Sequence, residues 1–239
     1  YAVADILCGQ ANPSGKLPMT FPVSYLDIPS SHNFPYYHKN VQRGEWDFLW
    51  GGPQRKNKNV DYTEYNEGIY VAEWLVSQGI AAAVVKYRLP NGHSNIPLTD
   101  VQNALRYCRA NADEWKIKSI GIMGFSAGGH LCASLATMWD HEELKKVFDT
   151  KGGLNKPNAA VLSYPVITAD EHAHKGSILN VSGCEEGTEG YKFFGLDKQV
   201  SEKTCPIYVW HTVTDGSVPV ENTIKLITAL QQHKVSFEC

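Results

Sequence analysis

The sequence predicts an α/β fold, in which a parallel β-sheet carries helices on both faces. Short apolar segments alternate with longer amphipathic segments from about residue 67 onward. The apolar segments show no polar alternation, which is typical of strands that are buried on both faces. The chain has 239 residues and is 43% hydrophobic. This content supports a substantial core, so the sequence predicts one large domain or two small ones.

Charge and cysteine content exclude several classes of protein. The formal net charge is −3 and the basic residues are scattered, so we expect no nucleic-acid partner. No run of about 18 apolar residues is present, so we expect no membrane-spanning helix. The six cysteines form no CxxC pair. We therefore expect buried free thiols, with no metal, no cofactor and no disulfide scaffold.

Residues 1–66 differ in texture from the rest of the chain. They contain six of the twelve prolines, and only residues 1–8 resemble a helix. Thr20 and Phe21 lie close to two prolines and predict a short extended piece of the edge type. Residues 30–59 are polar and aromatic without periodicity, which argues against ordinary compact architecture there. This part is therefore predicted to be a loop-rich segment.

Residues 67–239 predict helices and strands in alternation. Glu67–Ser77 has helical periodicity, with Gly79 as its end signal. Ile80–Tyr87 is rich in Ala and Val and predicts a buried strand. Pro97–Trp115 predicts a long amphipathic helix, capped near Thr99 or Asp100. Further elements are a strand over Ile117–Met123, a helix over Ala127–Met138, strands over Ala159–Tyr164 and Ile207–His211, a helix over Pro219–His233 and the start of a strand at Val235–Cys239.

The segment Gly124-Phe125-Ser126-Ala127-Gly128 matches the pattern G-x-S-x-G. It lies between a predicted strand and a predicted helix, the setting that a nucleophile elbow requires. The turn is sharp, so we expect a side chain at Gly124 or Gly128 to clash with neighbouring elements. Ser126 is the candidate nucleophile, and the backbone N–H of Ala127 is the candidate oxyanion-hole donor. The alternative is a Gly-rich turn with a capping serine.

Asp215 is the candidate acid that would orient a general base. A serine hydroxyl needs such a base to become a nucleophile near pH 7. On elbows of this kind the chain order is Ser, then Asp or Glu, then His. Asp215 follows the predicted strand that ends at His211, which fits this order. The alternative is a turn aspartate beside Gly216.

No histidine of the chain is assigned as that base. Only 24 residues follow Asp215, so the catalytic histidine is expected beyond residue 239. We interpret the other candidates as a cation at a helix end (His233), structural residues (His130 and His211) and solvated loop residues (His172 and His174). The segment Gly51-Gly52-Pro53 is a weak candidate for the second oxyanion-hole donor, because no apolar strand precedes it.

From about residue 67 to the end, the chain resembles the α/β-hydrolase esterases that act on acetylated plant polysaccharides, the acetyl xylan esterase-like group. The resemblance is carried by Val71–Leu75, Lys86–Pro90, Gly124–Leu131 and Thr214–Asn222. It implies Ser126 as nucleophile, Asp215 as triad acid, an acyl-enzyme and an acetylated oligo- or polysaccharide as substrate. It also implies a secreted or periplasmic location, which the residues themselves leave open.

Residues 1 to about 70 resemble a different family, the C-terminal sandwich domain of family 3 glycoside hydrolases, which are β-glucosidase- or β-xylosidase-like. This resemblance is carried by Asn12–Pro22, Val60–Glu64 and Glu67–Val71. The catalytic carboxylates of those enzymes lie upstream of this domain, so no glycosidase role carries over to any residue here.

The two resemblances together predict a chimeric or truncated chain. Residues 1–66 would be the glycoside hydrolase-like segment, and residues 67–239 an incomplete α/β-hydrolase domain that is truncated at its C-terminus. We expect impaired esterase activity, because the triad histidine is absent. One alternative is a non-catalytic fragment of a glycoside hydrolase. Another is a carbohydrate-binding or scaffold module, since six Trp and twelve Tyr allow sugar stacking.

Overall fold

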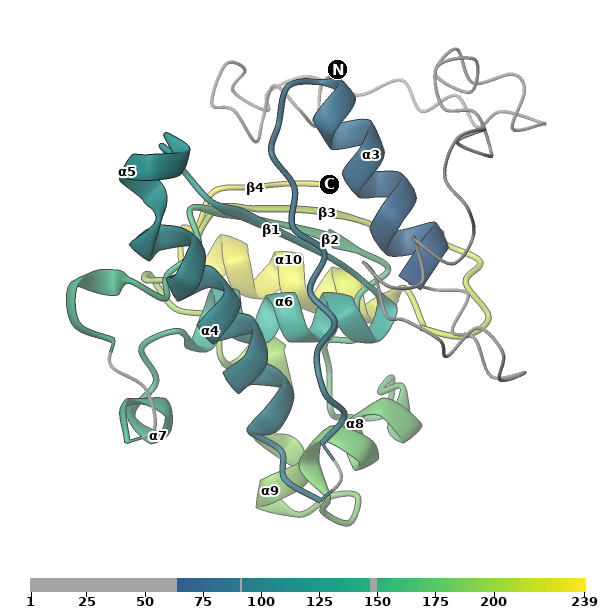
Figure 1. The fold of residues 1–239 in the computed structure, drawn as a ribbon. Helices are drawn as coiled ribbons and strands as arrows, with labels where there is room; N and C mark the ends of the chain where they lie inside the picture. Colours follow the sequence, from purple (N-terminus) through teal and green to yellow (C-terminus); the bar gives the residue numbers. More distant parts are fainter. Residues whose placement is uncertain (1–63, 91, 147–149) are drawn as a thin grey trace, which may run out of the picture. The chain divides into compact units, whose positions relative to one another are not determined.

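The computed structural model describes residues 64–90, 92–146 and 150–239 (Figure 1). The chain divides into two compact units. The described part of the smaller unit is residues 64–84, and the larger unit contains residues 85–239. The predictions for residues 1–63, including the helix over 1–8, lie outside the described residues.

The smaller unit contains the helix predicted over Glu67–Ser77. A π-helical turn over Glu64–Ile69 continues into α3, Tyr70–Ser77. The helix ends at Gly79, which has a φ of +81°. Its N–H donates to the carbonyl of Val76, and the N–H of Ile80 donates to that of Leu75. This pair of bonds closes the helix through a left-handed glycine, as the sequence predicted.

The predicted strand over Ile80–Tyr87 is wrong. Residues 80–90 have no regular secondary structure and are not part of the sheet. An apolar run forms a strand only where a neighbouring strand takes up its N–H and C=O groups. Among the described residues the sheet begins with β1, and no described strand pairs with this run.

The larger unit is built on a four-stranded parallel sheet. Its strands are β1 Gly121–Phe125, β2 Ala159–Ser163, β3 Ile207–Trp210 and β4 Phe237–Glu238. They lie in the order β1-β2-β3-β4, and each neighbouring pair is parallel. The parallel pairing confirms the predicted parallel sheet. Parallel neighbours require crossover connections, and the sequence places helices between these strands.

The first strand of the sheet begins later than predicted. Ile120 lies inside the predicted strand, but its N–H donates to the side-chain oxygen of Asn158, and its carbonyl accepts from the N–H of Asn158. These bonds use up the backbone groups of Ile120 just before β1 begins at Gly121. At its other end the strand runs two residues further than expected, to Phe125.

The predicted helix over 97–115 is divided. α4 covers Ile96–Ala110 and α5 covers Ala112–Trp115, with Asn111 between them. Neither Thr99 nor Asp100 is the cap, because the helix begins after Asn95. Inside the helix, the Thr99 hydroxyl donates to the carbonyl of Asn95, and Asp100 forms an ion pair of 2.7 Å with Arg88.

The remaining helices connect the strands of the sheet. Two of them match the prediction, α6 over Ser126–Met138 and α10 over Glu221–Gln232. Three short helices have no counterpart in the prediction, namely α7 Glu142–Lys145, α8 Lys175–Ser182 and α9 Glu189–Lys192. Among the described residues, no helix is long and apolar enough to cross a membrane.

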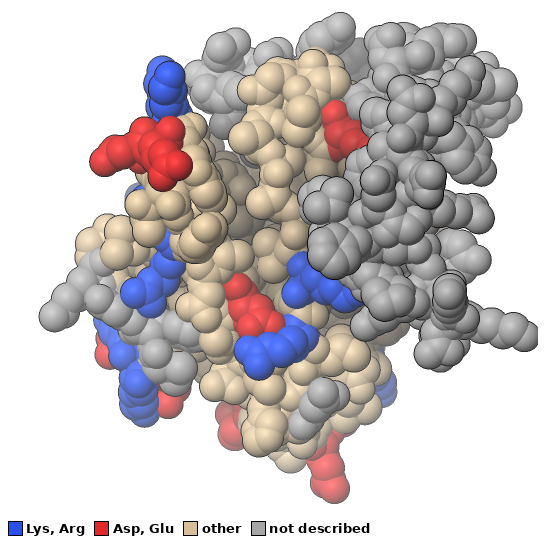
Figure 2. Space-filling view, in the orientation of Figure 1, with Lys and Arg blue, Asp and Glu red and all other residues tan. Residues whose placement is uncertain are grey.

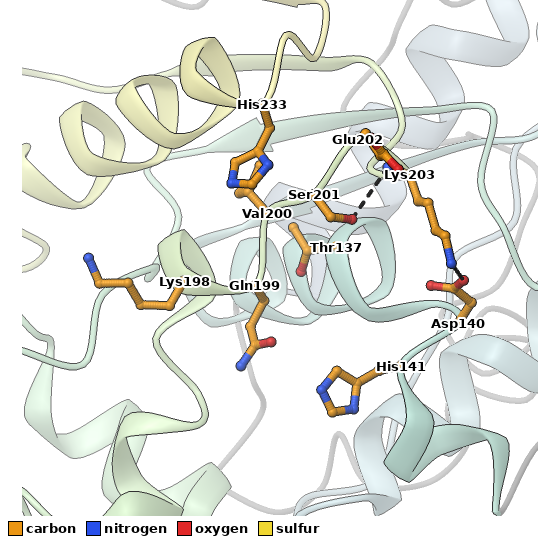
Figure 3. Close-up of a pocket in the computed structure, with 10 residues that line it drawn as sticks. All are labelled: Thr137, Asp140, His141, Lys198, Gln199, Val200, Ser201, Glu202, Lys203 and His233. Carbon is orange, nitrogen blue, oxygen red and sulfur yellow. Dashed lines mark hydrogen bonds and ion pairs between the residues drawn. The ribbon is translucent and has the colours of Figure 1, made fainter.

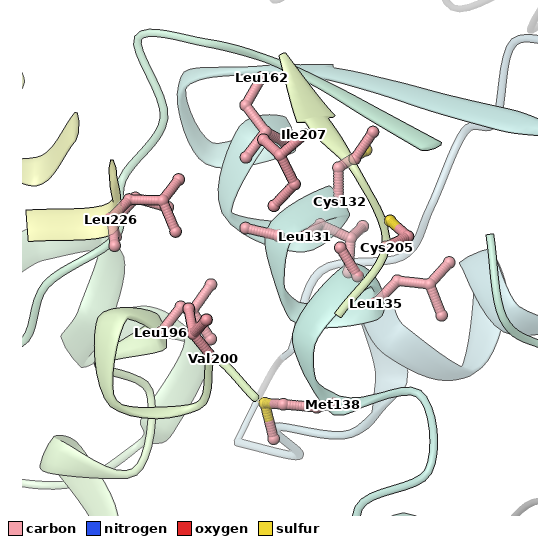
Figure 4. Close-up of a cluster of buried hydrophobic side chains, with 14 of the residues drawn as sticks. Leu131, Cys132, Leu135, Met138, Leu162, Leu196, Val200, Cys205, Ile207 and Leu226 are labelled. Atoms are coloured by element: carbon pink, nitrogen blue, oxygen red, sulfur yellow. The ribbon is translucent and has the colours of Figure 1, made fainter. Parts of the chain in front are cut away.

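The main core lies between the sheet and the helices α4, α6 and α10, which cover one of its faces (Figure 1). Leu162 and Ile207 project from β2 and β3 towards α6, which contributes Leu131 and Leu135 (Figure 4). Burial of each such side chain stabilises the fold by about 2 kcal/mol. The described residues of the larger unit show the predicted helical cover on this face only.

Candidate active site

Ser126 lies directly between a strand and a helix. β1 ends at Phe125 and α6 begins at Ser126, so no linker separates them. Ser126 has a φ of +51°, a conformation that costs a non-glycine residue about 1–2 kcal/mol. Its side chain is half-buried, and the next residue, Ala127, is exposed at the first turn of α6. The serine thus lies on a strained, accessible strand–turn–helix junction.

The close packing of this turn involves one of the two predicted glycines, Gly124, and a third glycine that was not predicted, Gly129. A Cβ at Gly124 would lie 2.5 Å from the carbonyl carbon of Gly128 and 2.8 Å from Cys132 Sγ. The expected clash is therefore confirmed for Gly124. It is wrong for Gly128, where, apart from its chain neighbours and the nearby backbone of α6 itself, no described atom lies within 4 Å of such a Cβ. Gly128 takes part through its carbonyl, and the second tight position is Gly129, whose Cβ would lie 2.9 Å from Pro165.

His130 lies one turn into α6 and is locked in the interior. Its Nδ1 lies 3.0 Å from the carbonyl oxygen of Val166, which only accepts, so Nδ1 carries the proton. Burial lowers the pKa of His130 to about 4, although the bond to Val166 raises it. The N–H of Val166 in turn donates to the carbonyl of Ser126 over 3.3 Å. This supports the structural interpretation of His130.

Asp215 lies in the loop that follows β3. Its Oδ1 accepts from the N–H groups of Ser217 and Val218 over 2.8 and 3.0 Å. These two bonds, that of Val218 first, lower the pKa of Asp215, so its carboxylate is ionised at neutral pH. The second oxygen, Oδ2, lies 3.5 Å from Nε2 of His211. Oδ1 thus holds the loop, and Oδ2 is the oxygen that is not bonded to it.

His211 supports this loop from the interior. Its side chain is 1% exposed. Nε2 lies 2.9 Å from the carbonyl oxygen of Val218, and Nδ1 lies 2.8 Å from the hydroxyl of Thr223. Nε2 therefore carries the proton, and Nδ1 accepts from the threonine. Because both nitrogens are engaged, His211 has the structural role that the sequence predicted.

His172, His174 and His233 take no part in the contacts described above for Ser126, His130, Asp215 and His211. His174 is not a solvated loop residue, because it caps α8 and its Nδ1 accepts from the N–H of Ser177. His172 lies 3.5 Å from Glu171. His233 is exposed at the end of α10, as expected.

Ser126 and Asp215 lie at the same edge of the sheet. Each follows the carboxyl end of a parallel strand, β1 and β3, and β2 lies between them. Two inter-strand spacings separate these strands by about 10 Å. The carboxyl edge of a parallel sheet is the usual position of an active site in such folds. β4 lies beside β3, so residues that follow β4 would emerge at this edge as well.

A pocket of about 500 Å³ lies at the other end of α6 (Figure 3). It is lined by Thr137, Asp140 and His141, by residues 198–203 and by His233. α6 rises about 1.5 Å per residue, so Thr137 lies about 16 Å from Ser126 along the helix. None of the predicted site residues lines this pocket.

Neither the distribution of charged side chains nor the grouping of possible metal ligands indicates a second binding site among the described residues. On the surface seen in Figure 2, the described Lys and Arg side chains are interspersed with Asp and Glu. Among the described residues, no three His, Cys, Asp or Glu side chains gather as metal ligands.

Two family models match the chain, and the residues that they match overlap. A family model described as BD-FAE matches residues 48–230. A model of the glycosyl hydrolase family 3 C-terminal domain matches residues 1–72. These matches confirm both resemblances. The boundary drawn between residues 66 and 67 stays a prediction, since the two matched ranges overlap.

Relatives of the larger part are named as enzymes of xylan breakdown. The chain is 43% identical over 177 residues to an acetylxylan esterase of Xylanibacter ruminicola, covering 70% of this chain and 34% of that protein. It is 36% identical over 180 residues to endo-1,4-beta-xylanase B of Butyrivibrio fibrisolvens, covering 72% and 28%. The chain thus spans about a third of the length of these curated relatives.

A solved structure supports the same fold. The acetyl ester-xyloside bifunctional hydrolase of Caldicellulosiruptor lactoaceticus matches with a TM-score of 0.63 and 38% identity. The match covers 71% of this chain and 63% of that one. The predicted α/β-hydrolase fold is therefore confirmed.

Proposed function

Because this chain belongs to the BD-FAE family, we propose that it is a carboxylic ester hydrolase that removes acetyl-type groups from plant polysaccharides. The observation that carries the proposal is Ser126, held at a φ of +51° between β1 and α6 with the exposed Ala127 beside it. The names of two relatives, an acetylxylan esterase and an acetyl ester-xyloside hydrolase, support an acetylated xylan as substrate.

The proposed reaction passes through an acyl-enzyme. The Ser126 hydroxyl oxygen attacks the ester carbonyl carbon while its proton passes to a general base. The carbonyl oxygen, on which negative charge develops, accepts a hydrogen bond from the N–H of Ala127, at the positive end of α6. The sugar hydroxyl then leaves with the proton, and water hydrolyses the acetyl–Ser126 ester to acetate and free serine.

Asp215 is proposed to orient the base. Its carboxylate is ionised, and its Oδ2 is the oxygen that is not bonded to the loop amides. A carboxylate so placed fixes the tautomer of a histidine and stabilises the imidazolium that forms.

The base itself is proposed to be a histidine beyond residue 239, which would follow β4. Two observations support this position. β4 lies next to β3, the strand that leads to Asp215. His130 and His211, two buried histidines near this edge, are each held by hydrogen bonds. We accordingly expect residues 1–239 alone to turn over esters slowly, since loss of one triad member costs about 10⁴–10⁶ in turnover.

Incubation of residues 1–239 with 4-nitrophenyl acetate tests the proposal. We expect slow release of 4-nitrophenol, with an acetyl group on the peptide that contains Ser126. Ser126→Ala should remove both signals, and addition of free imidazole should raise the rate for the unmodified chain. Rapid turnover that Ser126→Ala leaves unchanged would contradict Ser126 as the nucleophile. Rapid turnover that Ser126→Ala abolishes would instead contradict the absence of a base.

The match of residues 1–72 favours a second candidate, a non-catalytic fragment of a β-glucosidase- or β-xylosidase-like enzyme. In this view the chain holds no catalytic residues of its own, since the carboxylates of such enzymes lie upstream of the matched domain. 4-Nitrophenyl acetate discriminates between the two candidates. A folded chain that neither releases 4-nitrophenol from this ester nor becomes acetylated at Ser126 would support the non-catalytic fragment over the esterase.

A further inference from the structure

Asn222, in the first turn of α10, is completely buried, and its side-chain amide uses all of its hydrogen-bonding positions. Its exposed fraction is 0%. Its Oδ1 accepts from the N–H groups of Ile167 and Thr168 over 2.8 and 3.0 Å. Its Nδ2 donates to the carbonyl oxygens of His172 and Pro219, each over 2.9 Å. An amide side chain offers two acceptor and two donor positions, and all four are satisfied.

These partners determine the orientation of the amide. If oxygen and nitrogen were exchanged, the oxygen would face two carbonyl oxygens and the nitrogen would face two N–H groups. All four bonds would be lost in an interior that water does not reach. Asn222 is therefore specifically complementary to its surroundings.

Residues 166–168, here called the bridging segment, connect Asn222 to the serine. They follow β2, and their exposed fractions are 0–1%. At one end the N–H of Val166 donates to the carbonyl of Ser126, and its carbonyl accepts from His130. At the other end Ile167 and Thr168 donate to Asn222. The segment is thus held between the serine turn and α10.

The hydrogen bonds on the other side of Asn222 lead to the carboxylate of Asp215. Nδ2 of Asn222 holds the carbonyl of Pro219, and Pro219 directly follows Val218. The N–H of Val218 donates to Oδ1 of Asp215. A continuous series of hydrogen bonds and short stretches of backbone therefore runs from Ser126 to Asp215, and Asn222 is the side chain that joins its two halves.

We propose that Asn222 is a positioning residue that fixes the separation between Ser126 and the Asp215 loop. This inference rests on the proposed function, because it assigns a purpose to that separation. Asn222 does not touch the substrate and acts through the bridging segment and Pro219. A base held by Asp215 must meet the Ser126 hydroxyl within hydrogen-bond reach, and an error of about 1 Å in such geometry costs about 10²-fold in rate.

Asn155 provides a matched control. It too is 0% exposed, and its Nδ2 donates to Oε1 of Gln102 and to the carbonyl of Trp139, over 3.0 and 2.6 Å. These contacts lie between α4 and the end of α6, far from Ser126 along that helix. Asn222→Ala and Asn155→Ala each remove one buried amide, so both should lower the melting temperature.

The test compares hydrogen exchange and serine reactivity in the two variants. Asn222→Ala should speed amide exchange of Ile167 and Thr168 about tenfold or more, and that of Ser217 and Val218 with them. Asn155→Ala should leave these four amides unchanged. In a longer protein that carries the proposed histidine, acetylation of Ser126 by 4-nitrophenyl acetate, corrected for the folded fraction, should fall about tenfold or more in Asn222→Ala alone.

Exchange in the unmodified chain covers the case in which Asn222→Ala does not fold. With increasing urea, the amides of the bridging segment and of Ser217 and Val218 should open together, as one cooperative unit. Opening at clearly different urea concentrations would overturn the inference, as would equal effects of the two asparagine variants. If acetylation of Ser126 is absent in every variant, the proposed function fails, while the exchange data still decide whether Asn222 joins the two loops.

Discussion

A methyl group on Gly124 would overlap the carbonyl group of Gly128, four residues further along the chain. The backbone of β1 at Gly124 and the first turn of α6 thus lie too close together to leave room for a side chain at Gly124. The approach allows α6 to begin immediately after the strand. It places Ser126 at the outside of the turn, where the backbone reverses.

Replacement of Gly124 and of Gly128 by alanine should change the stability of the protein to very different extents. Gly124→Ala should destabilise the protein by about 3 kcal/mol or more, since backbone cannot give way as a flexible side chain does. Gly128→Ala should change stability by less than about 1 kcal/mol, because no described atom lies near its Cβ position and alanine favours a helix. Urea unfolding of both variants measures the difference. Equal destabilisation would mean that this turn is not packed as described.

The backbone strain at Ser126 should be visible in stability. Its φ of +51° is costly for alanine but not for glycine. Ser126→Gly should therefore be more stable than Ser126→Ala by about 1 kcal/mol, although both lose the hydroxyl. Thermal unfolding of the pair provides the measurement. If the alanine variant is the more stable one, the turn is relaxed.

Removal of the charge at Asp215 should distinguish its structural role in the loop from its proposed role in ester hydrolysis. In Asp215→Asn an oxygen can still accept from the N–H groups of Ser217 and Val218, so the melting temperature should change little. In a longer protein that carries the proposed histidine, ester hydrolysis should fall by about 10²–10⁴, because the oriented carboxylate is lost. In residues 1–239 alone the slow rate should change little, since the members of a triad act as a unit. Asp140→Asn is the control, since Asp140 pairs with Lys203 at the pocket in Figure 3 and should keep its rate.

Stability should decrease as the pH falls from about 6.5 to 4, and His130 should account for part of this. The folded protein holds the pKa of His130 at about 4, below the ordinary value of 6.5. In this window the unfolded chain takes up a proton that the folded protein does not bind, so unfolding becomes more favourable. The lost contribution is about 3 kcal/mol at most.

The variant His130→Gln checks this assignment. Glutamine keeps a donor for the carbonyl of Val166 but does not titrate. Its unfolding free energy, measured by urea at pH 7 and pH 4.5, should depend less on pH than that of the unmodified chain. An unchanged slope would show that other groups cause the acid sensitivity.

The cysteines should differ strongly in reactivity. Burial raises the pKa of Cys132 and of Cys205 to about 12, so their thiols are protonated at pH 8. Cys239 is exposed. We expect iodoacetamide at pH 8 to label Cys239 in the native protein, and Cys132 and Cys205 only after unfolding. Peptide mapping by mass spectrometry identifies the sites, and rapid labelling of Cys132 would contradict its place in the core.

Local pattern was sufficient to predict most of the elements. Ala159–Ser163 and Ile207–Trp210 are short apolar runs between turn residues, and both are strands as expected. The G-x-S-x-G segment predicted the junction at Ser126, because its glycines and its position after a strand are all adjacent in the chain. The same adjacency placed Asp215 in the loop after β3.

Contacts between distant parts of the chain decided the rest. Ile80–Tyr87 has the composition of a strand, but no described strand lies paired beside it, and strand formation depends on such pairing. Gly129, rather than Gly128, needs to lack a side chain, because Pro165 of another loop packs against it. Asn222 ends one of the segments that carry the family resemblance, but its bonding role gave no signal in the sequence, since two of its partners lie 54 and 55 residues away.

The sequence by itself therefore determined which residues form the strands, where the serine turn lies and to which family the chain is related. These properties follow from short-range spacing and composition. Only the tertiary structure decided which glycines are tight, which histidines are locked and how Ser126 is tied to Asp215. The physical reason is that steric overlap and hydrogen bonding depend on distances in space, which neighbours along the chain do not specify.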